Sequence, residues 1–201
     1  MTYSTIFEDL IKPVLCDLLS IDRVMGLEVL RAWRDHYHNS STTSRAVESS
    51  VGLHDYNHNS ALVFSGNLWM ATLRYALGIH LRDTELEAIE PAITAAMQSV
   101  ALTRDYWAWP RDSCSTSNVN RMNNAVAISM VERQCSEAQA MAVVKNAAIA
   151  AESKFLRCKR ELLDAMEEDH SEVVMLLDAV EHFAAGNSLW CSSRPLYHGR
   201  R

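Results

Sequence analysis

The chain has 201 residues, of which 48% are hydrophobic, and it carries a formal net charge of −6. This length favours one domain with a sizeable core, and we expect a single domain over residues 1–201. The acidic balance, without a basic stripe, disfavours nucleic acid or an anionic membrane as a partner. The sequence predicts neither a secretory signal nor a membrane span, so we expect a cytoplasmic protein. Five scattered cysteines without a C-x-x-C pair indicate reduced thiols, not a disulfide framework or a zinc site.

The scarcity of turn residues favours long helices. Six glycines and four prolines are few for this length, and folds with many strands need more residues that change the chain direction. Apolar residues recur every three or four positions over Ile6–Leu19 and Val24–Trp33, which predicts two helices. Between them, Ser20 and Asp22 are candidate N-caps. The polar stretch His38–Ser50 lacks this periodicity and predicts a loop.

Further helices are predicted along the rest of the chain. One should cover about 60–79, and Thr84 with Glu87 forms a capping box that opens a long helix. Pro91 and Pro110 are expected to kink or divide that helix. A later helix should begin at Asn118. The next should begin at a capping box of Ser136 with Gln139 and end near Met166. The last should begin at Asp169 or Ser171 and end near Gly186. The predicted class is therefore all-α, with about seven or eight helices and no strand.

The stretch Leu102–Asp112, LTRDYWAWPRD, concentrates three aromatic residues, two arginines and two aspartates. Such a composition is typical of a lined pocket. On a helix, Arg104, Ala108 and Asp112 fall within roughly 80° of one another and share one face. A second candidate, the segment HDYNH, has two histidines at the spacing of metal ligands. It lacks the Glu of a zincin motif, and a solvated helix face is the simpler interpretation.

Extended by one residue, ALTRDYWAWPRD resembles the N-D-x-x-S-x-x-x-E magnesium motif of class I terpene synthases, particularly the fungal fusicoccadiene-synthase-like cyclases. Upstream, LLSIDRVMGLEVLRAW is similar to the family's helix pair before the active site, and LRYALGIHLRDTELEAIEPAI is similar to its link into the metal-binding helix. Downstream, NNAVAISMVERQCSEAQAMAVVK resembles the helices that follow it. The end of the chain, AAGNSLWCSSRPLYHGR, resembles the family's G-N-x-x-W-S segment with its Arg-Tyr pair. The resemblance implies a helical bundle of the truncated class I terpene synthase, or isoprenoid synthase, type.

The chain departs from the family within the magnesium motif itself. Arg104 stands in the place of the Asn, Ala108 in that of the Ser and Asp112 in that of the Glu. A guanidinium cannot ligate a cation, and alanine offers no oxygen, so two of the three oxygen ligands are lost. We therefore expect neither a bound metal nor a cofactor.

Other positions that handle diphosphate in the family are also changed. The diphosphate-sensing Arg, the linker Asp and the hinge Gly of the family align near Ser60, Val63 and Ser65, and Leu196 takes the Arg place before Tyr197. The paired carboxylates of the upstream Asp-rich motif are not found. Without a magnesium cluster, a cyclisation that begins with loss of diphosphate is not expected.

The aromatic residues around these positions predict a concave site for a terpenoid. The polar groups expected to act in catalysis are Arg104, Asp105 and Asp112, and Arg104 is the donor expected to polarise a carbonyl or carboxylate of the substrate. The residues expected to bind the substrate are Phe64, Trp69, Tyr106, Trp107, Trp109, Trp190 and Tyr197. A helix cannot direct Tyr106, Trp107 and Trp109 to one side, so some of them must face away.

Three functions fit this pattern. The first is a metal-independent cyclase or isomerase, for example a pericyclase of Diels–Alder type, that acts on a terpenoid intermediate of secondary metabolism. The second is a non-catalytic remnant or partner subunit that binds a terpenoid or a synthase. The third is a divergent magnesium-dependent class I terpene synthase. A bundle that lacks its first helices would expose an apolar face, which a homodimer would cover.

Overall fold

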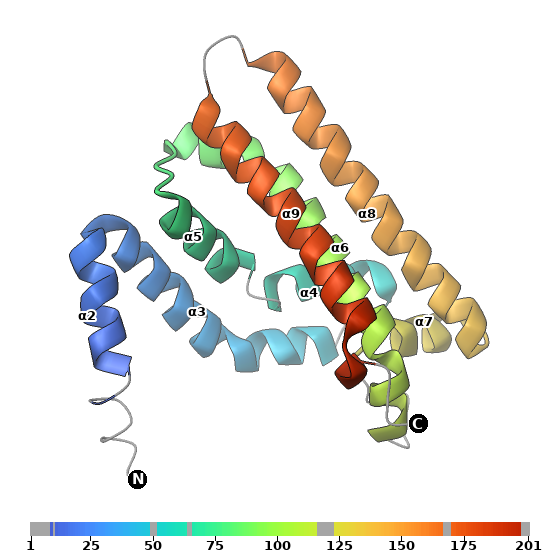
Figure 1. Cartoon of the computed structure of the whole chain (residues 1–201). Coiled ribbons are helices and arrows are strands. Elements are labelled where there is room, and N and C mark those ends of the chain that lie inside the picture. The colour runs from blue at the N-terminus through green and yellow to red at the C-terminus, as the bar shows by residue number, and fades with distance from the viewer. Residues whose placement is uncertain are drawn as a thin grey trace.

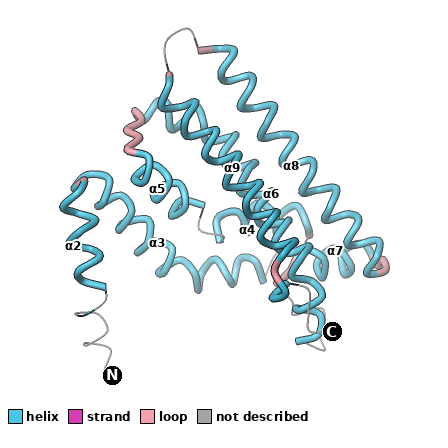
Figure 2. The backbone as a smooth tube through the Cα atoms, viewed as in Figure 1, coloured by secondary structure: helices cyan, strands magenta, loops and turns pink. Residues whose placement is uncertain are grey.

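The computed structural model describes residues 9, 11–48, 52–63, 66–115, 123–166 and 170–197. Within these ranges the backbone is almost entirely helical and contains no strand (Figure 2). Long helices pack side by side, with α6, α8 and α9 forming the largest group (Figure 1). The predicted all-α class is confirmed.

The helices α2 (Lys12–Ile21) and α3 (Arg23–Glu48) are joined by a single residue. That residue, Asp22, caps α3 as predicted, because its carboxylate accepts a hydrogen bond of 2.9 Å from the N–H of Met25. The loop predicted over 38–50 is wrong for 38–48, which belong to α3. Helix α4 packs against α3, and tertiary packing of this kind stabilises helix in segments that lack their own apolar periodicity.

Two helices, α4 (Leu53–Val63) and α5 (Gly66–Leu77), include most of the stretch predicted as one helix over 60–79. Helix α5 ends at Gly78, whose φ of 65° lies in the left-handed region that glycine adopts without strain. The N–H groups of Gly78 and of the next residue donate to carbonyls of the last turn at 3.2 and 2.9 Å. Glycine therefore fixes the end of α5 through a C-terminal cap.

The longest helix, α6 (Asp83–Ser115), runs through both of its prolines. Pro91 and Pro110 each remove one backbone donor, yet neither divides the helix. The capping box predicted at Thr84 is wrong, because the helix begins one residue earlier. Instead, Glu85 accepts a hydrogen bond of 2.8 Å from the N–H three residues before it.

The C-terminal half of the chain contains α7 (Ala125–Arg133), α8 (Glu137–Ala165), α9 (Ser171–Ser193) and the 3-10 helix η3 (Pro195–Tyr197). Helix α8 begins at the predicted capping box, in which Ser136 and Gln139 each satisfy the other's backbone N–H. It ends at Ala165 with Met166 as its C-cap, in agreement with the predicted end near Met166.

The starts of α7 and α9 differ from the predicted ones. Helix α7 is capped by Asn124, whereas the predicted start, Asn118, lies outside the described residues. Ser171 is the first residue of α9 and not its cap, and Asp169, the other candidate, also lies outside the described residues. Helix α9 continues beyond Gly186 for two further turns, which extends it toward the end of α6.

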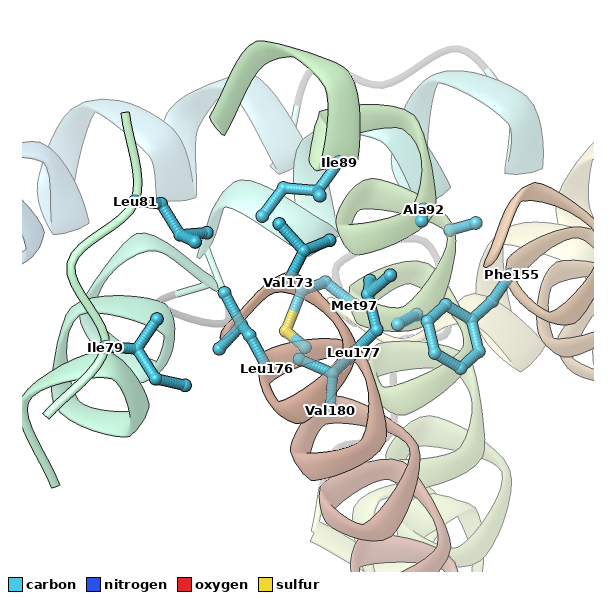
Figure 3. Packing of buried hydrophobic residues seen from close by; sticks show 12 residues of the cluster. Ile79, Leu81, Ile89, Ala92, Met97, Phe155, Val173, Leu176, Leu177 and Val180 are labelled. Atoms are coloured by element: carbon cyan, nitrogen blue, oxygen red, sulfur yellow. The ribbon is translucent and has the colours of Figure 1, made fainter. Parts of the chain in front are cut away.

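The first buried cluster joins the N-terminal half of α6 to α8 and α9 (Figure 3). Phe155 of α8 is directed toward Met97 of α6 and Leu177 of α9. Full burial of such a side chain contributes about 1.5–3 kcal/mol. This cluster therefore fixes the position of α9 on α6.

The second buried cluster joins the C-terminal half of α6 to α4, α7 and α8. Leu102 and Trp109 of α6 pack in it with Leu53 and Tyr56 of α4 and with the first turn of α7. The two ends of α6 thus have different neighbours. The end that carries the candidate motif is enclosed by α4, α7 and η3.

Several large apolar side chains are exposed on α3, α5 and α9. They include Val24, Trp33 and Tyr37 of α3, Trp69 of α5 and Trp190 of α9. Exposed apolar side chains mark sites of ligand or protein binding where they gather into one patch. None of the described helices combines the length and the apolar character that crossing a membrane requires.

Candidate functional site

The candidate motif occupies the continuous C-terminal half of α6, so Arg104, Ala108 and Asp112 share one helix face as predicted. Their environments differ. The side chain of Arg104 is 41% exposed and that of Asp112 is 29% exposed, whereas Ala108 is only 1% exposed. The face is therefore closed in the middle and open on either side.

Asp105, the next residue after Arg104, is buried. Its carboxylate accepts hydrogen bonds from the hydroxyl of Tyr56 and, at 3.0 Å, from the N–H of Ala125. Burial is the main cause that raises the pKa of Asp105, and the neighbouring Arg104 opposes the rise. Burial also raises the pKa of Tyr56 well above 10. This carboxylate ties α4, α6 and α7 together.

Asn124 completes the same polar group from the start of α7. Its side-chain oxygen accepts from the N–H of Val126 at 2.9 Å, which caps the helix. Its amide donates to the backbone carbonyl of Asp105 at 3.0 Å and to the carboxylate of Asp112 at 3.2 Å. One buried amide therefore fixes α7 against two turns of α6.

Each of the two exposed positions pairs an arginine with the aspartate that follows it. Arg104 lies 3.3 Å from a carboxylate oxygen of Asp105. Arg111 lies 2.7 Å from a carboxylate oxygen of Asp112. The charges of the motif are thus largely compensated within the helix.

The aromatic residues of α6 differ in burial, and both Trp109 and Tyr106 contact the second buried cluster. Trp109 is only 2% exposed and belongs to the second buried cluster, and its indole N–H has no partner within the described residues. Tyr106 and Trp107 are partly buried and pack edge to face, with ring centres 5.3 Å apart. As expected, the three rings do not share one side.

The remaining aromatic candidates come from α5 and α9. Trp69, 42% exposed, packs against Phe183 of α9 with ring centres 5.1 Å apart. Trp190, 50% exposed, lies two helical turns after Phe183 on the same side of α9. Phe64 lies outside the described residues. The structure therefore aligns Trp69, Phe183 and Trp190 along α9.

Tyr197 of η3 connects the end of α9 to the motif. The guanidinium of Arg111 lies over its ring, 5.6 Å from the centre. Its hydroxyl and the thiol of Cys191 form a hydrogen bond, and burial raises the pKa of both groups. Arg104 is close enough to act on both groups through its charge. Tyr197 thus lies between Arg111 of the motif and Cys191 of α9, and its predicted role in binding a substrate stays a prediction.

An open depression of about 440 Å³ lies at the C-terminal end of α9, beside the first residue of η3. It is lined by Gly186, Leu189, Trp190, Ser193, Arg194 and Pro195. The guanidinium of Arg194 stacks over the Trp190 ring, 3.9 Å from its centre. We name this feature the α9 depression. None of its lining residues belongs to the motif of α6.

A comparison with protein families shows to which family the chain belongs. Residues 25–154 match the family described as terpene synthase family 2, C-terminal metal binding. The chain belongs to terpene synthase family 2. The match includes the whole candidate motif of α6, and this agrees with the resemblance read from the sequence.

Three fungal synthases are among the relatives of this chain. The chain is 28% identical over 193 residues to a bifunctional terpene synthase of Fusarium proliferatum, with 92% of this chain and 25% of the relative covered. It is 28% identical over 197 residues to preterpestacin I synthase of Cochliobolus heterostrophus, with 92% and 27% covered. It is 25% identical over 187 residues to fusicoccadiene synthase of Phomopsis amygdali, with 90% and 25% covered. The chain spans about a quarter of the length of these relatives.

A solved structure supports the fold. The chain resembles the crystal structure of α-eudesmol synthase with a TM-score of 0.65 and 18% identity, over 85% of this chain and 57% of that one. The helical bundle of terpene synthase type, expected from the sequence, is therefore the observed fold. At this identity the likeness concerns the fold alone.

The residues at the family's metal-binding motif do not fit magnesium in this chain. Ala108 provides no oxygen and is buried, and Arg104 brings a positive charge to its position. The carboxylate of Asp112 already accepts hydrogen bonds from Arg111 and Asn124. Magnesium needs a near-octahedral set of oxygen ligands. No group of three or more His, Cys, Asp or Glu in the described ranges could hold a metal ion.

Sequence reasoning missed several residues that complete the site. Tyr56 of α4 and Asn124 before α7 contact the motif directly, and Cys191 of α9 hydrogen-bonds to Tyr197. Arg194 lies two residues before Leu196, which takes the family's Arg place. Asn124 stands just before an apolar helical run and could have been read as an N-cap. Nothing local in the sequence indicates that Tyr56 reaches a carboxylate 49 positions away.

Proposed function

We propose that this member of terpene synthase family 2 is an enzyme that cyclises or isomerises a terpenoid intermediate without magnesium. The reaction class is a rearrangement of the Diels–Alder or related pericyclic type, in which no leaving group is ionised and product and substrate have the same mass. The relatives are named as terpene and sesterterpene synthases, and this supports a terpenoid as the ligand.

One observation carries the proposal. Where the family's motif has metal ligands, this chain has a partly exposed guanidinium, a buried alanine and a carboxylate that is already paired. These groups cannot coordinate a metal ion that would stabilise a departing diphosphate. They do supply a permanent hydrogen-bond donor at the surface of an apolar bundle.

Arg104 is the donor in this proposal. Its planar guanidinium can bond to a carbonyl or carboxylate of the substrate through two parallel N–H groups. A donor that draws electron density from a conjugated carbonyl makes the attached alkene a more reactive dienophile, and fixed donors stabilise charge that develops in the transition state. Its pairing with the buried Asp105 holds one side of the guanidinium in place.

Asp105 and Asp112 act in different ways. Asp105 is enclosed by Tyr56, Ala125 and Arg104, so it is assigned as the positioning residue for Arg104. Asp112 is partly exposed and faces the same side of the helix as Arg104. It balances Arg111 and keeps that cation away from the Arg104 donor.

The apolar part of the substrate would lie on the aromatic side chains near this donor. Tyr106 and Trp107 follow Arg104 by two and three residues and are partly buried, and Tyr197 approaches from η3. Trp69 and Trp190 offer further exposed ring surface along α9. A rigid aromatic wall can hold a flexible polyene near its reactive conformation, which lowers the entropic part of the barrier.

Paired incubations test the proposal. The protein is incubated in EDTA with oxidised polyene terpenoids of sesqui-, di- and sesterterpenoid size, and the products are separated and weighed by mass spectrometry. A parallel reaction contains magnesium and the isoprenoid diphosphates of the same sizes. We expect a product isomeric with its substrate in EDTA and none from the diphosphates. Product only from the diphosphates with magnesium would refute the proposal and support a divergent magnesium-dependent synthase.

The exposed apolar surface favours one alternative, a non-catalytic subunit that binds a terpenoid or a synthase. Val24 and Tyr37 of α3 and Trp69 of α5 are exposed within the described part of the chain, and a protein partner or a second copy would cover such surface. Size measurement by light scattering and co-purification with a co-expressed synthase test this alternative. A stable complex without turnover would support it over the enzyme.

A further inference from the structure

The α9 depression has features of a ligand site that the motif on α6 does not explain. Its apolar wall is Leu189 with the exposed half of Trp190. Its polar wall is the guanidinium of Arg194, which stacks flat on the Trp190 ring. Stacking uses the face of the guanidinium and leaves its N–H groups, which lie in the plane of the group, directed outward.

Arg194 differs from the arginines of the motif in its charge balance. Arg104 and Arg111 each lie against an aspartate. Within the described residues, Arg194 has no carboxylate within ion-pairing distance, and its contact is the Trp190 ring. Trp190 therefore fixes a cation at the rim of the depression without neutralising it.

We propose that the α9 depression binds the carboxylate of an amphipathic ligand, an isoprenoid acid, through Arg194. The carboxylate would accept two parallel hydrogen bonds from the guanidinium, and the isoprenoid chain would cover Trp190 and Leu189. The ligand class is a terpenoid acid with one negative charge, because the depression presents one uncompensated guanidinium among its six lining residues.

The proposal rests on the proposed function for its choice of an isoprenoid chain. It goes further in naming the acidic group and a second cation that selects it. Cys191 follows Trp190 directly and bonds to Tyr197, which lies beside Arg104 and Arg111. A ligand held by Arg194 would therefore begin next to the group of residues assigned to the chemistry.

The test compares three probes that share one carbon chain: farnesoic acid, farnesol and farnesyl diphosphate. Their dissociation constants are measured by calorimetry in EDTA, at low and at moderate salt, for the wild type, Arg194→Ala and Arg160→Ala. Arg160 is an exposed arginine of α8 outside the depression and serves as the matched control. Circular dichroism melting verifies that each variant folds.

We expect farnesoic acid to bind the wild type about 10-fold more tightly than farnesol, a ratio typical of one charge-assisted contact. Arg194→Ala should reduce this ratio to about one, and Arg160→Ala should leave it unchanged. Added salt should weaken the binding of the acid and not that of the alcohol, because the contact between the carboxylate and Arg194 is exposed to solvent. Equal binding of acid and alcohol by the wild type, or an unchanged ratio in Arg194→Ala, would overturn the proposal. So would tighter binding of the diphosphate than of the acid, or failure of both acid and alcohol to bind.

The outcome is separable from that of the proposed function. If no terpenoid is turned over but the preference for the acid and its dependence on Arg194 are observed, the proposed enzymatic function is refuted and the binding site is supported. If a terpenoid is turned over in EDTA but the preference for the acid does not depend on Arg194, the enzymatic function is supported and this binding site is refuted.

Discussion

The hydroxyl of Tyr56 donates a hydrogen bond to the buried carboxylate of Asp105, a residue 49 positions later in the chain. The same carboxylate accepts from the first N–H of α7 and lies beside Arg104. A buried charge is tolerated only when such partners replace the water that it has lost. The contact therefore couples the stability of the α4–α6–α7 junction to the position of the proposed catalytic arginine.

Substitution of Tyr56 by Phe tests this coupling. The change removes the hydroxyl and leaves a buried carboxylate with one donor fewer. We expect the free energy of unfolding to fall by about 1.5–3 kcal/mol, the range for hydrogen bonds to charged groups. Urea unfolding followed by circular dichroism measures the change. Tyr37→Phe, at an exposed position of α3, is the control and should shift stability by less than about 0.5 kcal/mol.

The raised pKa of Asp105 predicts a pH dependence of stability. Burial raises this pKa above its ordinary value of 3.8, so the folded state holds the proton more tightly than the unfolded state does. The contribution of Asp105 to stability is therefore full below pH 3.8 and is lost as pH rises through the folded pKa. Asp105→Asn should remove this component. The difference between the unfolding free energies of wild type and variant, measured across pH, should shrink as pH rises through that window, and a constant difference would contradict the assignment.

Arg104→Ala should lower turnover by about 10- to 1000-fold, the range for loss of a single electrostatic donor. Arg104→Lys should restore only part of the rate, because an ammonium lacks the planar fork of the guanidinium. The rate on the terpenoid substrate in EDTA is measured with each variant and set against its melting temperature. A variant that melts early but turns over at the normal rate when folded would assign Arg104 to bracing Asp105 and not to catalysis.

Ala108→Ser restores one oxygen at a family metal-ligand position. Ala108 is buried, and a new hydroxyl there can bond to the carbonyl four residues earlier, so the cost should be about 1 kcal/mol. Urea unfolding measures it. The substitution should not create magnesium binding, because Arg104 remains in the adjacent turn and Arg111 stays paired with Asp112. Tight magnesium binding by this variant would mean that the loss of a single oxygen ligand at position 108 is enough to abolish metal binding.

Local patterns in the sequence predicted the features that depend on near neighbours. The capping box of Ser136 with Gln139 is confirmed, because its two partners lie within one turn. The box predicted at Thr84 failed because Glu85 already bonds to the N–H of Arg82. Both the box of Thr84 with Glu87 and the bond of Glu85 to Arg82 are possible starts of a helix. The residue at which the chain enters α6 decides which of them forms.

Features that depend on distant contacts could not be predicted. Trp109 was assigned to the substrate site, but it lies four residues after Asp105 on the side of α6 that packs against α4 and α7. The helix through 38–48 has few apolar residues of its own, and α3 packs with α4 and α5. A single sequence gives the period of a helix but not which side its neighbours will cover.

A titration of magnesium with pyrophosphate, followed by calorimetry, tests the central claim most directly. The claim is that this terpene synthase relative has exchanged a metal-binding motif for an arginine donor. The account predicts no binding of magnesium or of the magnesium–pyrophosphate pair beyond the heat of dilution. Micromolar binding of magnesium that requires pyrophosphate would contradict it, because the motif of Arg104, Ala108 and Asp112 would then still serve the family's chemistry.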